Sequence, residues 1–208
     1  MRPIPSGIRH SDEREEREAE RLGLRREHGP LVVQPEWRRV SDNRRVRLLV
    51  LGAPASGKTT VAASLRAAVP ALEVWDTDDE ILRLNNNIWP SIEDKNRELL
   101  PKIVDAAAQQ HQIILLNSYM PVELALNLKH VGFRIVLLEV PEEELRRRHK
   151  KRAVEEGWSN EEWFEWHQSA IEELRDRGLI DHVVSGEQTV DAMTTCLLEL
   201  QRAKSANE

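Results

Sequence analysis

The residues with the clearest chemical potential form a glycine-rich loop of the pattern Gly-x-x-x-x-Gly-Lys-Thr. Its glycines permit backbone conformations that a β-carbon would forbid, so that successive amide N–H groups can converge on phosphate oxygens. Lys58 would reach the terminal phosphates of a nucleoside triphosphate, and the Thr59 hydroxyl would coordinate Mg²⁺. The pattern predicts a phosphate-binding loop formed by Gly52, Ala53, Pro54, Ala55, Ser56, Gly57, Lys58, Thr59 and Thr60.

A group of carboxylates follows the second apolar run of the chain, at Asp76, Asp78 and Asp79. In an open α/β sheet, ligands bind outside the carboxyl ends of the strands, so we expect these carboxylates to face the same crevice as the loop. Transfer of a phosphoryl group to a hydroxyl needs a group that orients the acceptor and takes its proton, and it needs oxygen ligands for Mg²⁺. For Asp79 we expect a capping role at the start of the next helix.

The elements that must position these residues are strands alternating with helices. Short apolar runs predict the strands, and the first of them ends directly at Gly52. Apolar stripes at helical spacing predict the helices. The alternation favours a parallel sheet covered on both faces. The expected strands are 46–51, 72–75, 113–116, 134–140 and 182–184, and the expected helices are 58–69, 79–84, 92–110, 141–156, 160–177 and 189–203.

The loop, together with the stretch from Trp75 to Ile81, resembles the small P-loop kinases, namely shikimate kinase, gluconate kinase, adenylate kinase and the polynucleotide-kinase-like group. The resemblance implies an α/β fold of the P-loop NTPase type, a three-layer α/β/α sandwich with a five-stranded parallel sheet in the order 2-3-1-4-5. It implies that Asp78 is the catalytic carboxylate facing the acceptor and that Asp76 serves Mg²⁺. The implied phosphoryl donor is ATP, and the implied metal is Mg²⁺.

A basic stretch follows the fourth predicted strand, and Arg148 and Arg152 share a helix face there because they lie four residues apart. Their placement resembles the lid arginines of nucleotide kinases. The resemblance implies a helical lid at about residues 141–177, in which these two arginines act catalytically on the phosphates. It also places Gly186-Glu187 at the loop that borders adenine.

Other residues of the predicted lid have ordinary structural explanations. We expect His149 to be a surface residue rather than a catalyst. Trp163 and Trp166 lie three apart on one predicted helix, and packing is their default explanation.

The third predicted strand ends in Asn117, where many nucleotide-binding proteins have an aspartate. The Asp-Gly-x-Pro-Arg signature of adenylate-type kinases is absent, which argues against a nucleoside-monophosphate kinase. The glycine-rich acceptor segment of shikimate kinase is missing too, so shikimate itself is not expected as the acceptor. We expect the acceptor to lie over Asp78 and the segment 79–97, in which Arg83 or Arg97 would clamp an anion and Trp89 would stack on a ring; the segment also offers Asn85, Asn86, Asn87 and Lys95.

Composition narrows the class of protein. The net charge of −6 gives no support to non-specific nucleic-acid binding, so nucleic acid is not the expected partner. The single cysteine, Cys196, cannot form an intrachain disulfide, which fits a reducing compartment. No apolar run approaches the roughly 20 residues of a membrane-spanning helix, so we expect no membrane contact and a cytoplasmic protein.

The chain divides into two parts by character. Residues 1–45 are rich in charges of both signs and poor in apolar residues, and we expect a flexible extension that offers a contact surface to a protein partner. Residues 46–208 are expected to form the kinase-like domain.

Three functions follow from this pattern. The leading one is an ATP-dependent kinase that phosphorylates a small metabolite, nucleoside or nucleotide. The second is a kinase acting on a nucleic-acid end or a nucleotide-sugar. The third is a non-catalytic, nucleotide-dependent switch or assembly factor, suggested by Asn117 at the end of the third strand.

Overall fold

The computed structural model describes residues 47–156 and 161–203, and of residues 156 and 161–163 it describes the backbone alone. The predicted extension 1–45 lies outside the described residues, as does the side chain of Trp163. Among the described residues, no helix combines the length and the apolar character needed to cross a membrane.

One parallel sheet lies at the centre of the described domain, with the strand order β2-β3-β1-β4-β5. This confirms the predicted order. Leu51, the last residue of β1, pairs with Asn117 of β3 on one side and Leu137 of β4 on the other. Because β1 is central, every residue after its first is buried. The strands are β1 (Arg47–Leu51), β2 (Glu73–Asp76), β3 (Ile113–Asn117), β4 (Phe133–Glu139) and β5 (His182–Ser185).

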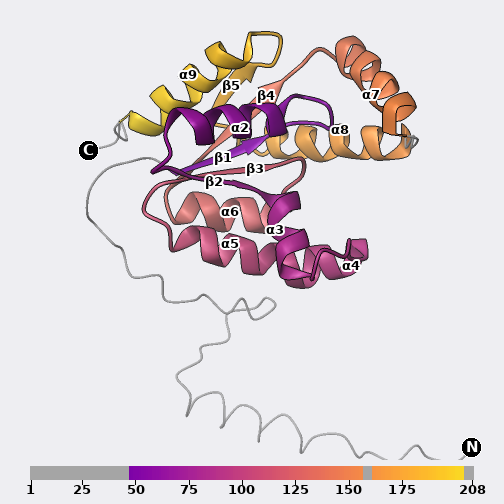
Figure 1. Ribbon diagram of the computed structural model, residues 1–208. Helices are drawn as coiled ribbons and strands as arrows, with labels where there is room; N and C mark the ends of the chain where they lie inside the picture. The colour runs from indigo at the N-terminus through magenta and orange to yellow at the C-terminus, as the bar shows by residue number, and fades with distance from the viewer. Residues whose placement is uncertain (1–46, 157–160, 204–208) are drawn as a thin grey trace, which may run out of the picture. The chain divides into compact units, whose positions relative to one another are not determined.

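Helices cover both faces of the sheet, as the resemblance implied (Figure 1). Alternate residues of β1 show the division, since Leu48 and Val50 belong to one apolar cluster and Leu49 and Leu51 to the other. The first cluster packs under α2 (Lys58–Ala68) and α9 (Val190–Arg202). The second packs against α3 (Thr77–Leu84), α5 (Leu100–Ala108), α6 (Val122–His130) and α8 (Glu161–Asp176). The remaining helical segments are α4 (Ile92–Asp94), the π-helical turn η1 (Lys95–Leu99) and α7 (Glu142–Glu156).

The sequence pattern did not predict α6. This helix buries Val122, Ala125 and Leu128, which lie three apart, but Leu126 on its other side is 47% exposed and blurs the apolar stripe. Such a short helix depends on packing against the sheet rather than on its own propensity.

Two predictions about single residues are wrong. Asp79 does not cap α3, because the helix begins earlier, at Thr77, and the Asp76 side chain accepts the capping hydrogen bond from the Asp78 N–H at 3.1 Å. Asp79 instead pairs with Arg66. His149 is not a surface residue, since it is only 7% exposed and its ring lies 6.1 Å from that of Phe164.

Candidate active site

The phosphate loop connects the end of β1 to the start of α2, at the carboxyl edge of the sheet. Gly57 precedes α2 with φ of 98°, a left-handed conformation that glycine adopts without steric cost. Ala55 also has a positive φ, 65°, and the Ser56 N–H donates to the Ala53 carbonyl at 3.1 Å. The loop therefore has the tightly turned backbone that exposes successive N–H groups at a helix N-terminus.

Gly52 allows the loop to pack against the sheet. A β-carbon at this position would lie 2.7 Å from the Ser56 hydroxyl and 3.0 Å from the Leu138 carbonyl of β4. Ser56 itself is fully buried. The first glycine of the motif is thus required by close packing, and the last by backbone conformation.

Lys58 is folded back onto its own loop. Its ammonium group donates to the carbonyl oxygens of Gly52 and Ala53 at 2.7 and 3.0 Å, and lies 3.4 Å from the Ser56 hydroxyl. Burial lowers the pKa of Lys58 to about 8, the carboxylates of Asp76 and Asp78 oppose this, and the charge of Arg152 adds to it. An ammonium group that binds carbonyl oxygens next to a phosphate loop could bind phosphate oxygens in their place.

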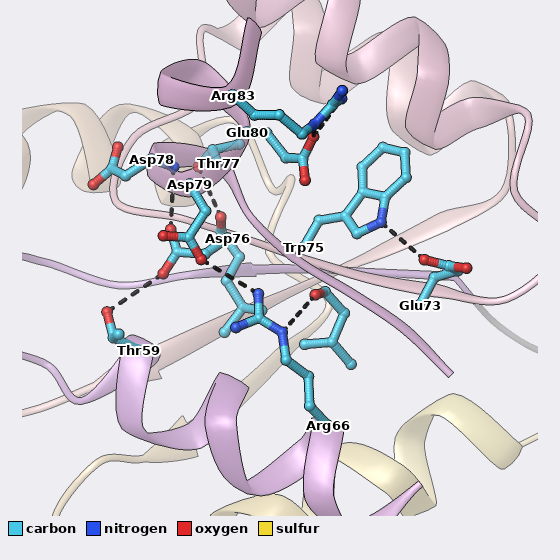
Figure 2. A network of polar contacts seen from close by, with 12 residues as sticks. Thr59, Arg66, Glu73, Trp75, Asp76, Thr77, Asp78, Asp79, Glu80 and Arg83 are labelled. Carbon is cyan, nitrogen blue, oxygen red and sulfur yellow. Dashed lines mark hydrogen bonds and ion pairs between the residues drawn. The ribbon is translucent and has the colours of Figure 1, made fainter. Parts of the chain in front are cut away.

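Thr59 on the first turn of α2 and Asp76 at the end of β2 point toward one another (Figure 2). The Thr59 hydroxyl donates to the Asp76 carboxylate at 3.3 Å, and the other oxygen of the carboxylate accepts from the Asp78 N–H. Asp76 is only 7% exposed, and burial raises the pKa of its carboxyl group. In Figure 2 the side chain of Asp78, two residues further along the chain, points away from the Thr59 hydroxyl.

The Thr59 hydroxyl and the Asp76 carboxylate offer two oxygen ligands, which fits a magnesium ion whose other ligands come mainly from a nucleotide. The described residues contain no group of three or more metal-ligating side chains. Mg²⁺ is commonly held by one or two protein oxygens together with substrate phosphates and water, rather than by a complete protein cage. A buried carboxylate with a raised pKa gains most from such a cation, because the positive charge offsets the cost of its desolvation.

The predicted acceptor side extends from the first turn of α3 to η1. The Asp78 side chain is 53% exposed and pairs with Lys95 at 3.3 Å. Arg83 and Arg97, the predicted anion clamps, each bind a glutamate three or four residues earlier in the chain, Glu80 and Glu93, at 2.7 and 2.6 Å. Trp89 is 51% exposed.

The predicted lid arginines lie on α7. Arg148 donates to the Glu144 carboxylate at 2.7 Å, and its guanidinium lies 3.4 Å from the Gly186 carbonyl, in the loop that was matched to the adenine-bordering loop. Hydrogen bonds from Arg147 and Arg148 lower the pKa of Glu144 to about 2. Arg152 is exposed one turn further along α7.

An aromatic contact joins α8 to the loop after β3. The rings of Trp166 and Tyr119 lie 4.4 Å apart, and Trp166 remains 41% exposed. Packing against Tyr119 thus accounts for part of the Trp166 side chain, as predicted from its helical spacing.

Asn117 is the buried polar residue at the end of β3. It is 1% exposed, and its amide oxygen accepts from the Tyr119 N–H at 3.4 Å, which orients the amide group. The amide nitrogen has no hydrogen-bond partner within the described residues. A buried donor that stays without a partner costs about 1–3 kcal/mol.

The structure brings Lys58, Thr59 and Asp76 together at one edge of the sheet, with Asp78 beside them. Thr60 is exposed on the first turn of α2. The contacts of Lys95 with Asp78 and of Arg148 with Gly186 were not predicted, because each joins residues distant in sequence and no local pattern signals it.

A glycine-rich loop leading from the central strand of a 2-3-1-4-5 parallel sheet into a helix defines a P-loop protein with the fold of the small P-loop kinases. The chain belongs to the AAA domain family, whose model matches residues 48–177. No protein of curated function matches the chain.

Solved structures of kinases share this fold. Shikimate kinase from Bacteroides thetaiotaomicron is similar with a TM-score of 0.58 and 16% identity, covering 74% of this chain and 97% of that one. Shikimate kinase from Acinetobacter baumannii, in complex with shikimate, gives 0.58 and 18% over 75% of this chain and 92% of that one. APS kinase from Mycobacterium tuberculosis, in complex with AMPPNP and APS, gives 0.52 and 14% over 78% and 100%. At these identities the likeness establishes the fold.

Proposed function

We propose that this protein is a magnesium-dependent kinase that transfers the γ-phosphoryl group of ATP to a hydroxyl group of a small metabolite, nucleoside or nucleotide. The observation that carries the proposal is that two carboxylates, Asp76 and Asp78, lie beside the phosphate loop and differ in burial. Asp76 is buried and contacts Thr59, whereas Asp78 is half-exposed beside it. One carboxylate thus suits the metal and the other suits the acceptor.

The reaction assigns a role to each side chain. The loop N–H groups and Lys58 would hold the triphosphate, and Thr59 and Asp76 would hold Mg²⁺. Bound Mg²⁺ supplies neutralisation of the charge that develops on the phosphate oxygens. Asp78 would accept the proton of the acceptor hydroxyl while the acceptor oxygen bonds to the γ-phosphorus and the bond to the β-phosphate oxygen breaks, releasing ADP. Arg148 and Arg152 would stabilise the transferred group from α7.

The test is transfer of labelled γ-phosphate from ATP to a panel of sugars, sugar acids, nucleosides, nucleotides and oligonucleotide ends. Asp78→Asn should lower the transfer rate about 10²- to 10⁴-fold and leave the affinity for a non-hydrolysable ATP analogue unchanged. Asp79→Asn is the matched control, because Asp79 is the neighbouring carboxylate and pairs with Arg66. Undiminished transfer by Asp78→Asn would reject Asp78 as the base.

The oligonucleotides in this panel test the second enzyme hypothesis. If the label appears on a nucleic-acid end and on no small molecule, the protein is a kinase of nucleic-acid ends rather than of a small acceptor.

A non-catalytic switch is the competing proposal, and the buried Asn117 favours it. An aspartate at the end of β3 would add a negative charge near the metal, which an amide cannot supply. Tight binding of the ATP analogue, no transfer to any acceptor, and a partner captured only by the nucleotide-bound form would favour the switch. Phosphoryl transfer by the isolated protein would reject it.

A further inference from the structure

The acceptor side of the site contains an ion pair between elements that are distant in sequence. The Lys95 ammonium lies 3.3 Å from the Asp78 carboxylate, 17 positions earlier in the chain. The two side chains differ in burial, since Lys95 is 17% exposed and Asp78 is 53% exposed. A lysine this enclosed is uncommon unless something holds its charge.

The backbone at Lys95 explains how the side chain becomes enclosed. Ser91 caps α4 by accepting from the Asp94 N–H, and Lys95 then opens the π-helical turn η1. The Lys95 carbonyl accepts from the Leu100 N–H, five residues on, so Lys95 lies one wide turn before a fully buried leucine. Single π-helical turns are rare in proteins, and those that occur are often found at functional sites.

An aromatic ring completes the surroundings of the ammonium group. Lys95 Nζ lies 5.0 Å from the centre of the Trp89 ring, within the range of a cation–π contact. Lys95 is therefore held between Trp89 and Asp78. By contrast, Arg83 and Arg97 are 64% and 78% exposed and bind glutamates only three and four residues earlier in the chain.

From this arrangement we propose that Lys95 is the positioning residue for Asp78. Its ammonium group, fixed by Trp89 and the π-helical turn, holds the exposed carboxylate in one orientation toward the acceptor hydroxyl. This inference rests on the proposed function, in which Asp78 takes the acceptor proton. A freely rotating carboxylate would spend little time in the reactive geometry, and a displacement of about 1 Å at a reacting group can cost about 10²-fold in rate.

The experiment compares Lys95→Met, which keeps the length of the side chain but removes the charge, with Lys95→Arg, which keeps the charge. Lys102→Met is the matched control, because Lys102 is 64% exposed on α5 and pairs with Glu98, four residues earlier, at a distance of 3.9 Å. The readouts are kcat and KM for ATP with an acceptor that the wild-type protein phosphorylates, or with water as acceptor in ATP hydrolysis. Calorimetry with a non-hydrolysable ATP analogue and thermal unfolding accompany them.

We expect Lys95→Met to lower kcat about 10-fold or more with KM for ATP and analogue affinity unchanged, and Lys95→Arg to recover most of the loss. A merely structural role of Lys95 would lower the unfolding temperature in Lys95→Met without the selective loss of kcat and without its recovery in Lys95→Arg.

Two outcomes would overturn the inference. If the wild-type protein is active and Lys95→Met has the same kcat, Lys95 does not position Asp78, and the proposed kinase function is unaffected. If the wild-type protein binds the analogue but neither transfers nor hydrolyses, the proposed function is rejected and the inference falls with it.

Discussion

The phosphate loop and the acceptor side of the site are built by different means. In the loop, Ser56 is fully buried and Lys58 binds backbone carbonyls, so the geometry is set by the main chain and by the packing of β1. On the acceptor side, Ile88 and Trp89 are 66% and 51% exposed, and the polar contacts join side chains to one another. In the proposed function, backbone groups would bind the triphosphate, whereas the exposed side chains would be free to vary with the acceptor.

The largest effect that would sharpen this comparison is expected from Lys58→Ala. Removing the ammonium group should lower the phosphoryl-transfer rate about 10²- to 10³-fold, because charge that develops on the phosphate loses a direct donor. Calorimetry and transfer assays measure the change, with Lys102→Ala, on the exposed face of α5, as control. Unaltered binding and transfer in Lys58→Ala would remove the basis of the whole assignment.

Gly52→Ala tests whether the loop is as closely packed as its contacts indicate. The added methyl group would meet the Ser56 hydroxyl at 2.7 Å and the Leu138 carbonyl at 3.0 Å, so the loop must shift away from β4. We expect a loss of stability of about 1–3 kcal/mol and weaker binding of the ATP analogue. Thermal unfolding with and without the analogue measures both changes. If neither stability nor affinity changes, the phosphate loop is not more tightly packed than the acceptor side.

A smaller effect on the phosphate loop is expected from the protonation of Lys58, which makes analogue affinity and stability depend on pH. Burial lowers the pKa of Lys58 to about 8, and bound phosphates would raise it, so affinity for the ATP analogue should fall as pH rises above 8. In the unfolded chain the same lysine titrates near 10.5. The unfolded state therefore binds more protons between the two values, and the nucleotide-free protein should gain stability from pH 8 to 10.5.

Calorimetry and denaturant titrations across this pH interval measure the two trends. Lys58→Ala serves as control, because it should show neither contribution. A wild-type affinity that does not change with pH would contradict the burial of the ammonium group.

The smallest effect is expected on the acceptor side, from Arg97→Ala. Arg97 and Glu93 are 78% and 69% exposed, and pairs of this kind stabilise a helix by about 0.3–0.5 kcal/mol. The midpoint of thermal unfolding should therefore move by no more than about 2 °C. A loss above about 2 kcal/mol would show that this region is packed as tightly as the phosphate loop, against the comparison drawn above.

The strands were predicted to within one residue at every end, because apolar runs such as those of β1 and β3 are bounded by polar residues. Prediction failed where the signal depended on packing. Helix α6 has a weak apolar stripe, and His149 sits in a run of charges but is buried against Phe164. The role of Asp76 as the cap of α3 was missed because β2 passes directly into that helix.

By itself, the sequence determined the phosphate loop, since its glycines, Lys58 and Thr59 lie within eight consecutive positions and act through local backbone geometry. The order of the sheet was predictable only through family resemblance. The tertiary structure alone decided that Lys95 meets Asp78, that Asp76 meets Thr59 and that Arg148 reaches Gly186. Such contacts depend on how separate elements pack in three dimensions, and a periodicity of three or four residues carries no information about that packing.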